Sequence, residues 1–116
     1  MAKFEFSKKV ITLEFPNVKF DVEYTDDVAA KFRNAGDALT KIAPEVETNP
    51  ALGIAEIKKC IDIMCGAGAC DKIMQDRAVN IWDYIDVYAY IIREFNQFFA
   101  DMTKKYTANI NLKTGK

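Results

Sequence analysis

The sequence predicts an α+β fold that is mostly helical, in which an N-terminal antiparallel β-hairpin precedes three to four helices. Apolar and polar residues alternate between Lys3 and Tyr24, which is the period of a sheet with one buried face. From Thr25 onward, apolar residues instead recur every three or four positions, as they do on a helix. The last stretch with this spacing, Asn80–Tyr106, contains no Gly or Pro and predicts one long C-terminal helix.

The N-terminal alternation divides at Pro16-Asn17 into two longer runs. Because Pro presets its φ angle and Asn tolerates turn geometry, we expect Val10–Phe15 to pair antiparallel with Val18–Tyr24. Lys3–Phe6 is a candidate third strand, separated from the others by a turn. A sheet of two or three strands is marginal in water, so helices must cover its apolar face.

A start signal for the first helix stands at Thr25, whose hydroxyl can cap the helix, and the two acidic residues that follow it suit the positive end of the helix dipole. One apolar stripe then runs from Val28 to Ile42 on an otherwise polar helix. Gly36 in its middle costs about 1 kcal/mol relative to Ala and is a candidate for close packing on the sheet. Since Pro44 has no backbone N–H, we expect the helix to end near Ile42 or Ala43.

The second helix has clear signals at both ends. Asn49-Pro50 supplies a cap and a first-turn proline, and Gly66-Ala67-Gly68 stops the apolar pattern after Cys65. Ala69–Gln75 is a candidate short helix, and Asn80 is a good cap for the long one. The middle of the chain is therefore expected to hold one helix over Pro50–Cys65 and a second, shorter one.

The long helix carries two adjacent apolar rows, which together cover roughly 200° of its surface where a helix on a single core needs only about 100°. We therefore expect other parts of the protein, or a partner, to pack against this helix from two sides. One row is predicted to be core: Ile85, Tyr88, Ile92 and Phe95. The other row can be either core or a surface for a second copy or a client: Tyr84, Val87, Ile91 and Phe98.

A helix of this length is roughly 40 Å long, which is at least the diameter of a compact domain of this size. Its C-terminal turns are therefore expected to overhang the core and to offer Phe99, Met102 and Tyr106 to a neighbour. The predicted interface joins these three residues to the Tyr84–Phe98 row. From Thr107 the periodicity is lost, which predicts a single α+β domain over 1–106 and a flexible tail over 107–116.

The bulk composition limits the classes of function. A formal net charge of −1, with Lys pairs far apart in the sequence, does not provide the concentrated basic surface that nucleic-acid binding needs. No apolar run approaches the ~20 residues of a membrane span, and the N-terminus has no signal-peptide core. We expect a soluble, cytoplasmic protein that binds neither nucleic acid nor membrane.

Residues that could support catalysis or metal binding are few. The chain has no His, which removes the commonest general base and metal ligand. Cys60, Cys65 and Cys70 have a spacing of five that matches zinc sites poorly, so we expect them to be small apolar residues of a reduced protein rather than metal or redox groups.

Three further patterns have a structural interpretation beside a chemical one. Gly66-Ala67-Gly68 follows a helix rather than a strand and lacks the other residues of a phosphate loop, which favours a helix–helix turn. The pairs Asp26/Asp27 and Asp83/Asp86 are expected to serve helix starts and a polar helix face rather than a carboxylate site. Ser7 is the only Ser, and without His it cannot form the usual triad. We therefore expect no enzyme, cofactor or metal.

The order of elements resembles a known family. Val18–Asp27 (VKFDVEYTDD) leads into the first helix, Cys65-Gly66-Ala67-Gly68 precedes the short Lys72-Ile73-Met74 segment, and the aromatic Ile85–Tyr106 closes the ordered part. This chain resembles the small tail-assembly-chaperone-like proteins encoded by tailed phages and prophages of Gram-positive bacteria. The resemblance spans most of the chain but consists of pattern and order rather than of a motif that carries chemistry.

The resemblance implies a non-enzymatic assembly factor in the bacterial host cytoplasm. Members of that family bind the long helical tape-measure protein while tail-tube subunits polymerise around it, so the partners implied are the tape-measure protein and the major tail protein. A homo-oligomer is also expected, and such genes often produce a longer, frameshifted product. A structural tail component and an unrelated cytoplasmic homo-oligomeric adaptor are the alternatives.

Overall fold

Residues 3–113 fold into a small β-hairpin and four helices, in the order β1 (Val10–Glu14), β2 (Lys19–Glu23), α1 (Asp26–Val46), α2 (Pro50–Cys65), α3 (Ala69–Met74) and α4 (Ile81–Lys113). The computed structural model describes residues 3–113, apart from the side chains of Ile42 and of residues 111–113. The predicted α+β class, the N-terminal antiparallel hairpin and the long C-terminal helix are confirmed.

The hairpin pairs in the register that places Ile11 opposite Val22 and Leu13 opposite Phe20. These four apolar side chains lie on one face, but β1 is the more deeply buried strand, since Ile11 and Leu13 are 3% and 0% exposed while β2's apolar residues are half-buried. The predicted third strand, Lys3–Phe6, does not form: within residues 3–113 the sheet has two strands, and this segment is unpaired.

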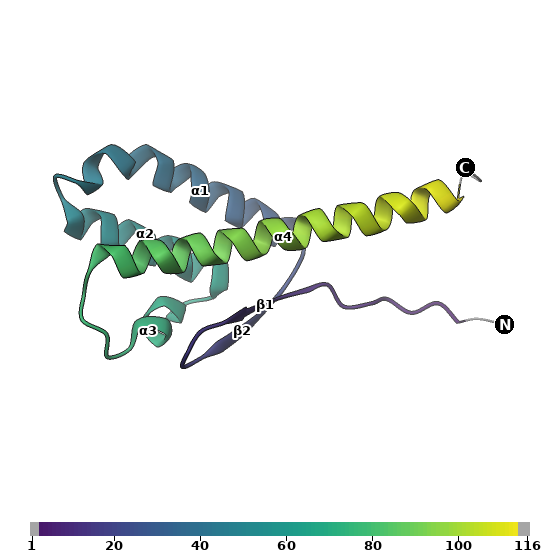
Figure 1. The fold of residues 1–116 in the computed structure, drawn as a ribbon, viewed down its shortest axis with the longest axis horizontal. Helices are drawn as coiled ribbons and strands as arrows, with labels where there is room; N and C mark the ends of the chain where they lie inside the picture. Colours follow the sequence, from purple (N-terminus) through teal and green to yellow (C-terminus); the bar gives the residue numbers. More distant parts are fainter. Residues whose placement is uncertain (1–2, 114–116) are drawn as a thin grey trace.

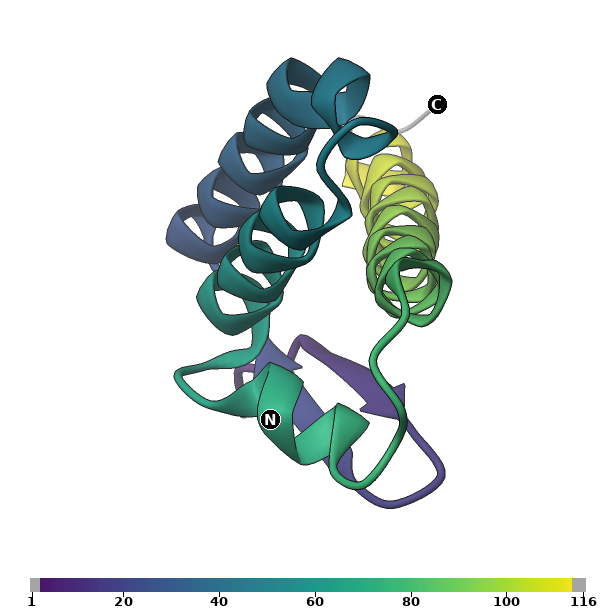
Figure 2. The same ribbon diagram turned by 90° about the vertical axis from the view of Figure 1, so that its left-hand side faces the viewer.

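Helices α1 and α2 form an antiparallel pair on one side of the molecule, and α4 runs past them on the other (Figure 1). Seen end-on, the hairpin and α3 lie together below the gap between the α1–α2 pair and α4 (Figure 2). The amide of Asn17, at the hairpin turn, donates to the Lys72 carbonyl at 2.7 Å and to Gln75 at 3.0 Å, which fixes the hairpin against α3.

The helix starts follow the local signals of the sequence. The Thr25 hydroxyl accepts from the Val28 N–H at 3.1 Å, and the Asn49 side chain accepts from the Leu52 N–H at 3.3 Å. Helix α2 has the predicted bounds, and the Gly-Ala-Gly segment is the predicted turn, with Gly68 in the left-handed region at φ 80° and Gly66 at φ 115°. Both angles are accessible to Gly at little cost.

The predicted end of the first helix is wrong. Helix α1 continues through Pro44 to Val46. The ring removes one hydrogen bond in the last turn, but Val46 reaches α2, where its side chain would lie only 3.0 Å from a Cβ placed on Gly53. This tertiary contact favours the helical path that the local sequence disfavours. Within the predicted stripe, Phe32 and Ala35 are buried, and the side chain of Ile42 lies outside the described residues.

Helix α4 begins at the predicted position but does not end there. The Asn80 side chain caps it by accepting from the Asp83 N–H at 2.9 Å, and the helix continues past Tyr106 to Lys113. Seven residues assigned to the predicted tail are thus helical, because no Gly or Pro occurs between Thr107 and Lys113. Residues 114–116 of that tail lie outside the described residues.

The core is closed around the first half of α4. Its centre comprises Leu13 of β1, Ile61 of α2 and Ile91 of α4, each with no exposed surface. Both α2 and β1 pack against α4, so the expectation that this helix is held from two sides is confirmed. None of the described helices is long and apolar enough to cross a membrane.

Candidate functional site

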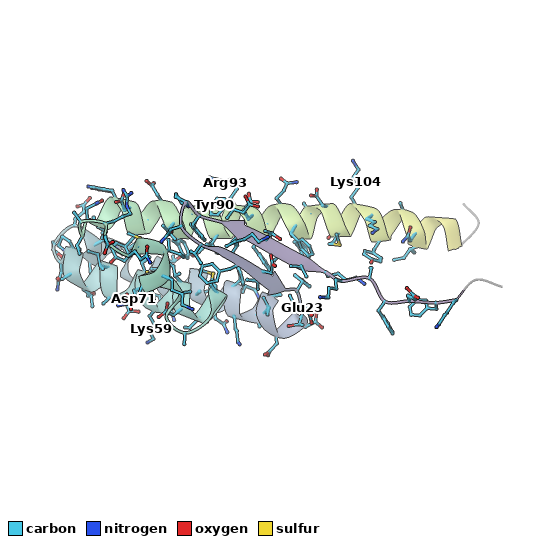
Figure 3. The ribbon with its side chains drawn as sticks, turned by 90° about the horizontal axis from the view of Figure 1, so that it is seen from below. Glu23, Lys59, Asp71, Tyr90, Arg93 and Lys104 are labelled. Carbon is cyan, nitrogen blue, oxygen red and sulfur yellow. The ribbon has the colours of Figure 1, made fainter. Side chains whose placement is uncertain are left out.

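The second half of α4 projects beyond the body of the protein. In Figure 1 it extends to the same side as the N-terminal segment, away from the α1–α2 turn. The molecule measures 60 × 29 × 19 Å, and its radius of gyration of 17.4 Å exceeds the about 13 Å of a compact domain of this length. Lys104 points away from the body on this projecting part (Figure 3).

The projecting half carries an apolar stripe, which we call the overhang face: Phe99, Met102, Tyr106 and Ile110. At 100° per residue these four side chains fall within roughly 80° of one another. Phe99 and Ile110 are 52% and 61% exposed. The predicted interface contained the first three of these residues; Ile110 was missed because the sequence was interpreted as a tail after Tyr106.

The predicted Tyr84–Phe98 row lies differently. Ile91 has no exposed surface and belongs to the centre of the core, so its assignment to an interface is wrong. Tyr84, Val87 and Phe98 are half-buried and pack against that core. Both β1 and α2 meet α4 on this side, and Val87 and Phe98 also border grooves at the surface.

The other row, predicted to be core, packs against the core with half-buried side chains and also borders a groove. A groove of about 350 Å³ lies between α1 and α4, lined among others by Phe32, Tyr88, Ile92 and Phe95. The Phe32 and Phe95 rings stack across it with centroids 4.3 Å apart, which joins the two helices at one point.

A second groove, of about 590 Å³, continues along the overhang face from Lys9 and Tyr24 to Tyr106. The two grooves share Tyr24 and Phe99. We call the combined feature the α4 groove; its apolar lining is Tyr24, Ala29, Phe32, Tyr88, Ile92, Phe95, Phe98, Phe99, Met102 and Tyr106.

Tyr24, at the end of the hairpin, organises the middle of the α4 groove. Its ring stacks on Phe95 and Phe98, with centroids 5.9 and 5.6 Å away, and lies tilted to Phe99 at 6.4 Å. Four aromatic rings from the end of the hairpin and from α4 therefore lie together in one wall of the groove. Farther along, the Lys9 ammonium lies 5.8 Å from the centre of the Tyr106 ring, a cation–π distance.

A family model described as a family of unknown function (DUF6673) matches residues 16–115, which is most of the chain. The chain belongs to the DUF6673 family. No curated protein and no solved structure matches it.

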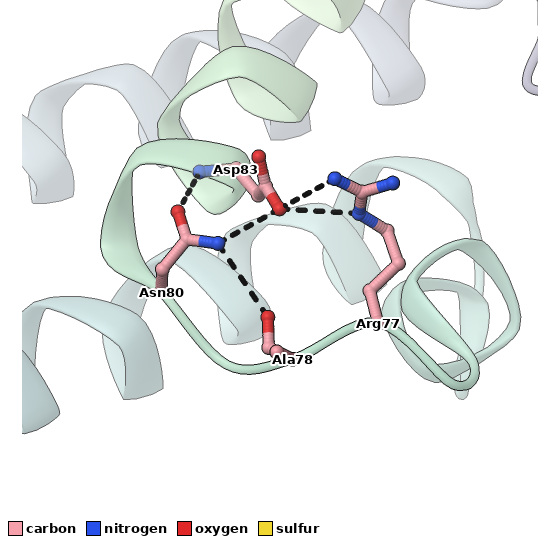
Figure 4. A network of polar contacts seen from close by, with 4 residues as sticks. All are labelled: Arg77, Ala78, Asn80 and Asp83. Atoms are coloured by element: carbon pink, nitrogen blue, oxygen red, sulfur yellow. Dashed lines mark hydrogen bonds and ion pairs between the residues drawn. The ribbon is translucent and has the colours of Figure 1, made fainter.

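The polar groups of this DUF6673 chain serve its helix ends. Arg77 donates to the Asp83 carboxylate at 2.8 and 3.1 Å, and the Asn80 amide donates to the same oxygen at 2.9 Å (Figure 4). Hydrogen bonding from Arg77, then from Asn80, holds the pKa of Asp83 below its usual value. Asp83 is thus engaged at the start of α4 rather than paired with Asp86.

A groove of about 490 Å³ lies beside this network, bordered by Pro16, Met74 and Asp86 among others. Of the carboxylates that line it, Asp83 is already bound by Arg77. Among residues 3–113, no three His, Cys, Asp or Glu side chains come together as a metal site.

The Gly66–Gly68 turn also has a structural role. The Cys70 N–H at the start of α3 donates to the Asp62 carboxylate at 2.9 Å. A carboxylate of the chain itself thus occupies the place where a phosphate would bind a helix N-terminus. The DUF6673 chain uses this segment as a turn between α2 and α3.

Two of the three cysteines pack in the core as the sequence predicts, since Cys60 and Cys70 are 2% and 1% exposed. Burial raises the pKa of Cys65 to about 12 and that of Cys70 to about 11. A high thiol pKa keeps the reactive thiolate scarce at neutral pH. The three thiols are free of disulfides.

Proposed function

We propose that this protein is a non-enzymatic assembly chaperone that holds an amphipathic helix of a client protein in the α4 groove. The observation that carries the proposal is the continuity of the two grooves at Tyr24 and Phe99, with the exposed overhang face at one end. An apolar groove of this kind binds a helix through side chains spaced by three and four residues.

The dimensions of the groove suit such a client. From Tyr88 to Tyr106 it follows five turns of α4, which is roughly 27 Å and corresponds to about 18 residues of bound helix. The floor is apolar and aromatic, and Arg33, Lys9 and Asp26 stand at its border. A client helix with an apolar stripe would therefore be favoured.

The resemblance to tail-assembly-chaperone-like proteins supplies the class of client. On that basis the bound helix belongs to a tape-measure protein, and the process is tail morphogenesis in a bacterial host. Membership of the DUF6673 family assigns no function. The groove and the resemblance support the same kind of activity, which is transient binding of the apolar face of a long helical protein.

The test is binding of a labelled peptide from the tape-measure protein of the same tail gene cluster, followed by fluorescence anisotropy. Phe99→Asp should weaken binding at least tenfold, because it places a charge in the middle of the groove. Trp82→Asp is the matched control, since Trp82 is a 70% exposed aromatic residue on the same helix outside the groove. Equal binding by both variants would contradict the proposal.

Purified tails provide a second readout. A chaperone should be absent from them, whereas stoichiometric presence would favour a structural tail component. A gene with no tail genes beside it would favour the unrelated adaptor.

A further inference from the structure

The segment before the hairpin has the sequence of a strand but pairs with no strand within residues 3–113. Phe4 and Phe6 alternate with Lys3 and Glu5, and their rings lie against each other with centroids 4.7 Å apart. The two rings are 74% and 87% exposed. Exposed phenylalanines adjacent to each other on an extended segment are costly in water, so a surface that covers them is expected.

The hairpin offers one uncovered edge. In an antiparallel hairpin, every second pair of facing residues exchanges backbone hydrogen bonds. The Phe15 N–H donates to the Val18 carbonyl, and the Tyr24 N–H donates to the Lys9 carbonyl. The pairs Leu13–Phe20 and Ile11–Val22 lie between these two at intervals of two residues and are therefore hydrogen-bonded as well. The backbone groups of the alternate residues therefore point outward on each strand.

On β1, the outward N–H of Glu14 donates to the Tyr90 hydroxyl of α4 at 3.0 Å, so α4 covers this edge. On β2, the outward groups belong to Lys19, Asp21 and Glu23, and no hydrogen bond within residues 3–113 reaches them. Figure 3 shows Tyr90 on the α4 side of the hairpin and Glu23 on the opposite side. An edge strand of this kind is a template for a further strand.

We propose that Lys3–Ser7 of one copy of this chain adds as a third, antiparallel strand to the β2 edge of a second copy. One register places apolar residues opposite each other on the buried face and opposite charges opposite each other on the solvent face. It places Phe4 opposite Phe20 and Phe6 opposite Val18, where β2's apolar side chains are only half-buried.

On the solvent face the same register places Lys3 opposite Asp21 and Glu5 opposite Lys19, so that both pairs have opposite charges. Asp21 and Lys19 are also residues whose backbone groups point outward. A shift by two residues in either direction sets Glu5 opposite Asp21 or Lys3 opposite Lys19, which are like-charge pairs.

The segment cannot reach this position on its own hairpin. In this register Ser7 lies beside Asn17, at the turn, whereas Val10 pairs with Glu23 at the other end of β2. The two places are six residues apart along the strand, roughly 20 Å, and two strand spacings apart across the sheet. The three Cα–Cα steps from Ser7 to Val10 span at most about 11 Å. The added strand must therefore come from a second copy.

The first test is the association state of the full chain, measured by sedimentation over a range of concentrations. A dimer is expected, and Phe4→Asp with Phe6→Asp should raise its dissociation constant at least tenfold. The matched control is Val79→Asp with Trp82→Asp, a pair 73% and 70% exposed elsewhere, which should leave the dimer unchanged. Circular dichroism should show that both variants are folded, because all four side chains are exposed.

A charge exchange tests the register. Glu5→Lys should weaken the dimer by placing a Lys opposite Lys19, and adding Lys19→Glu should restore it. A disulfide tests the geometry directly: Phe4→Cys on one chain and Phe20→Cys on another should form a covalent dimer on oxidation, because such a pair is about 4.5 Å apart between Cα atoms. Neither single variant alone should do so.

Three results would overturn the proposal: a monomer at every concentration, a dimer that Phe4→Asp with Phe6→Asp leaves intact, or an internal disulfide in a chain carrying both cysteines. A dimer that only Phe99→Asp disrupts would place self-association on the overhang face and would also overturn it. Peptide binding by the α4 groove is scored separately, so either proposal can fail while the other stands.

Discussion

Ile91 and Ile110 show at the residue scale how the same side chain takes two roles on one helix. Ile91 is 0% exposed between α2 and β1, whereas Ile110 is 61% exposed on the overhang face. Removing buried methylene groups costs both transfer free energy and the cavity left behind, whereas removing exposed ones costs neither. Burial, and not residue type, decides what each position contributes.

We therefore expect Ile91→Ala to lower the free energy of unfolding by about 2–5 kcal/mol, because Ile91 lies at the centre of the core. Ile110→Ala should change it by less than about 0.5 kcal/mol. Urea denaturation followed by circular dichroism measures both. Similar losses for the two variants would mean that the overhang face is covered in solution.

At the element scale, two glycines mark where helices approach each other. A Cβ on Gly53 of α2 would lie 2.9 Å from the Cδ1 atom of Ile81 and 3.0 Å from Val46, so α2 meets the start of α4 and the end of α1 there. A Cβ on Gly36 of α1 would find only the Tyr88 hydroxyl at 3.4 Å, an ordinary contact. The expected close packing of Gly36 is thus against α4 rather than the sheet.

These distances predict opposite effects for the same substitution. Gly36→Ala should raise the free energy of unfolding by up to about 1 kcal/mol, the difference in helix propensity between Gly and Ala. Gly53→Ala should lower it, because overpacking typically costs about 1–3 kcal/mol and outweighs that gain. Thermal denaturation of both variants decides this. A stabilised Gly53→Ala would show that the three-helix contact is looser than described.

At the scale of the whole molecule, the elongated shape separates a packed body from a helix that extends beyond it. Side chains from Thr107 to Ile110 are all exposed, so α4 is supported there only by its own backbone hydrogen bonds. Isolated helical turns open readily, because their stability in proteins comes mostly from tertiary packing. A client that packs on the overhang face would order these turns.

Hydrogen exchange can follow this difference along α4. Amides beyond Tyr106 should exchange at least tenfold faster than those around Ile91, since the former open locally and the latter open only with the core. Addition of the tape-measure peptide should slow the exchange of the overhang and leave Trp82 unaffected. Equal protection along the whole helix in the absence of peptide would contradict the description of an uncovered overhang.

The parts of the fold that could be predicted are those set by neighbouring residues. The bounds of α2 follow from the Asn49-Pro50 start and the Gly66 stop, and the hairpin follows from the alternation around Pro16-Asn17. Two predicted helix ends were wrong. At Pro44 tertiary packing opposed the local signal, and α1 continues to Val46. After Tyr106 the sequence has no stop signal, and α4 continues to Lys113.

The candidate site could be predicted only in part, for the same reason. Phe99, Met102 and Tyr106 followed from the length of α4 relative to a compact domain, and this needs no knowledge of contacts. Tyr24 and Phe32 could not be assigned, because their place in the groove depends on how the hairpin and α1 meet α4.

The sequence by itself determined that one long helix would carry more apolar surface than a single core can cover, because spacing and composition alone set the width of that surface. Only the tertiary structure decided how deeply each residue of the two rows is buried. The two rows are nearly equal in hydrophobicity, and the approach of β1 and α2 placed Ile91 at the centre of the core and left Tyr88, Ile92 and Phe95 half-buried beside the groove. The projecting half of α4 depends on both levels. The sequence determines the length of the helix, and the tertiary structure determines which of its turns lie beyond the packed body and are exposed.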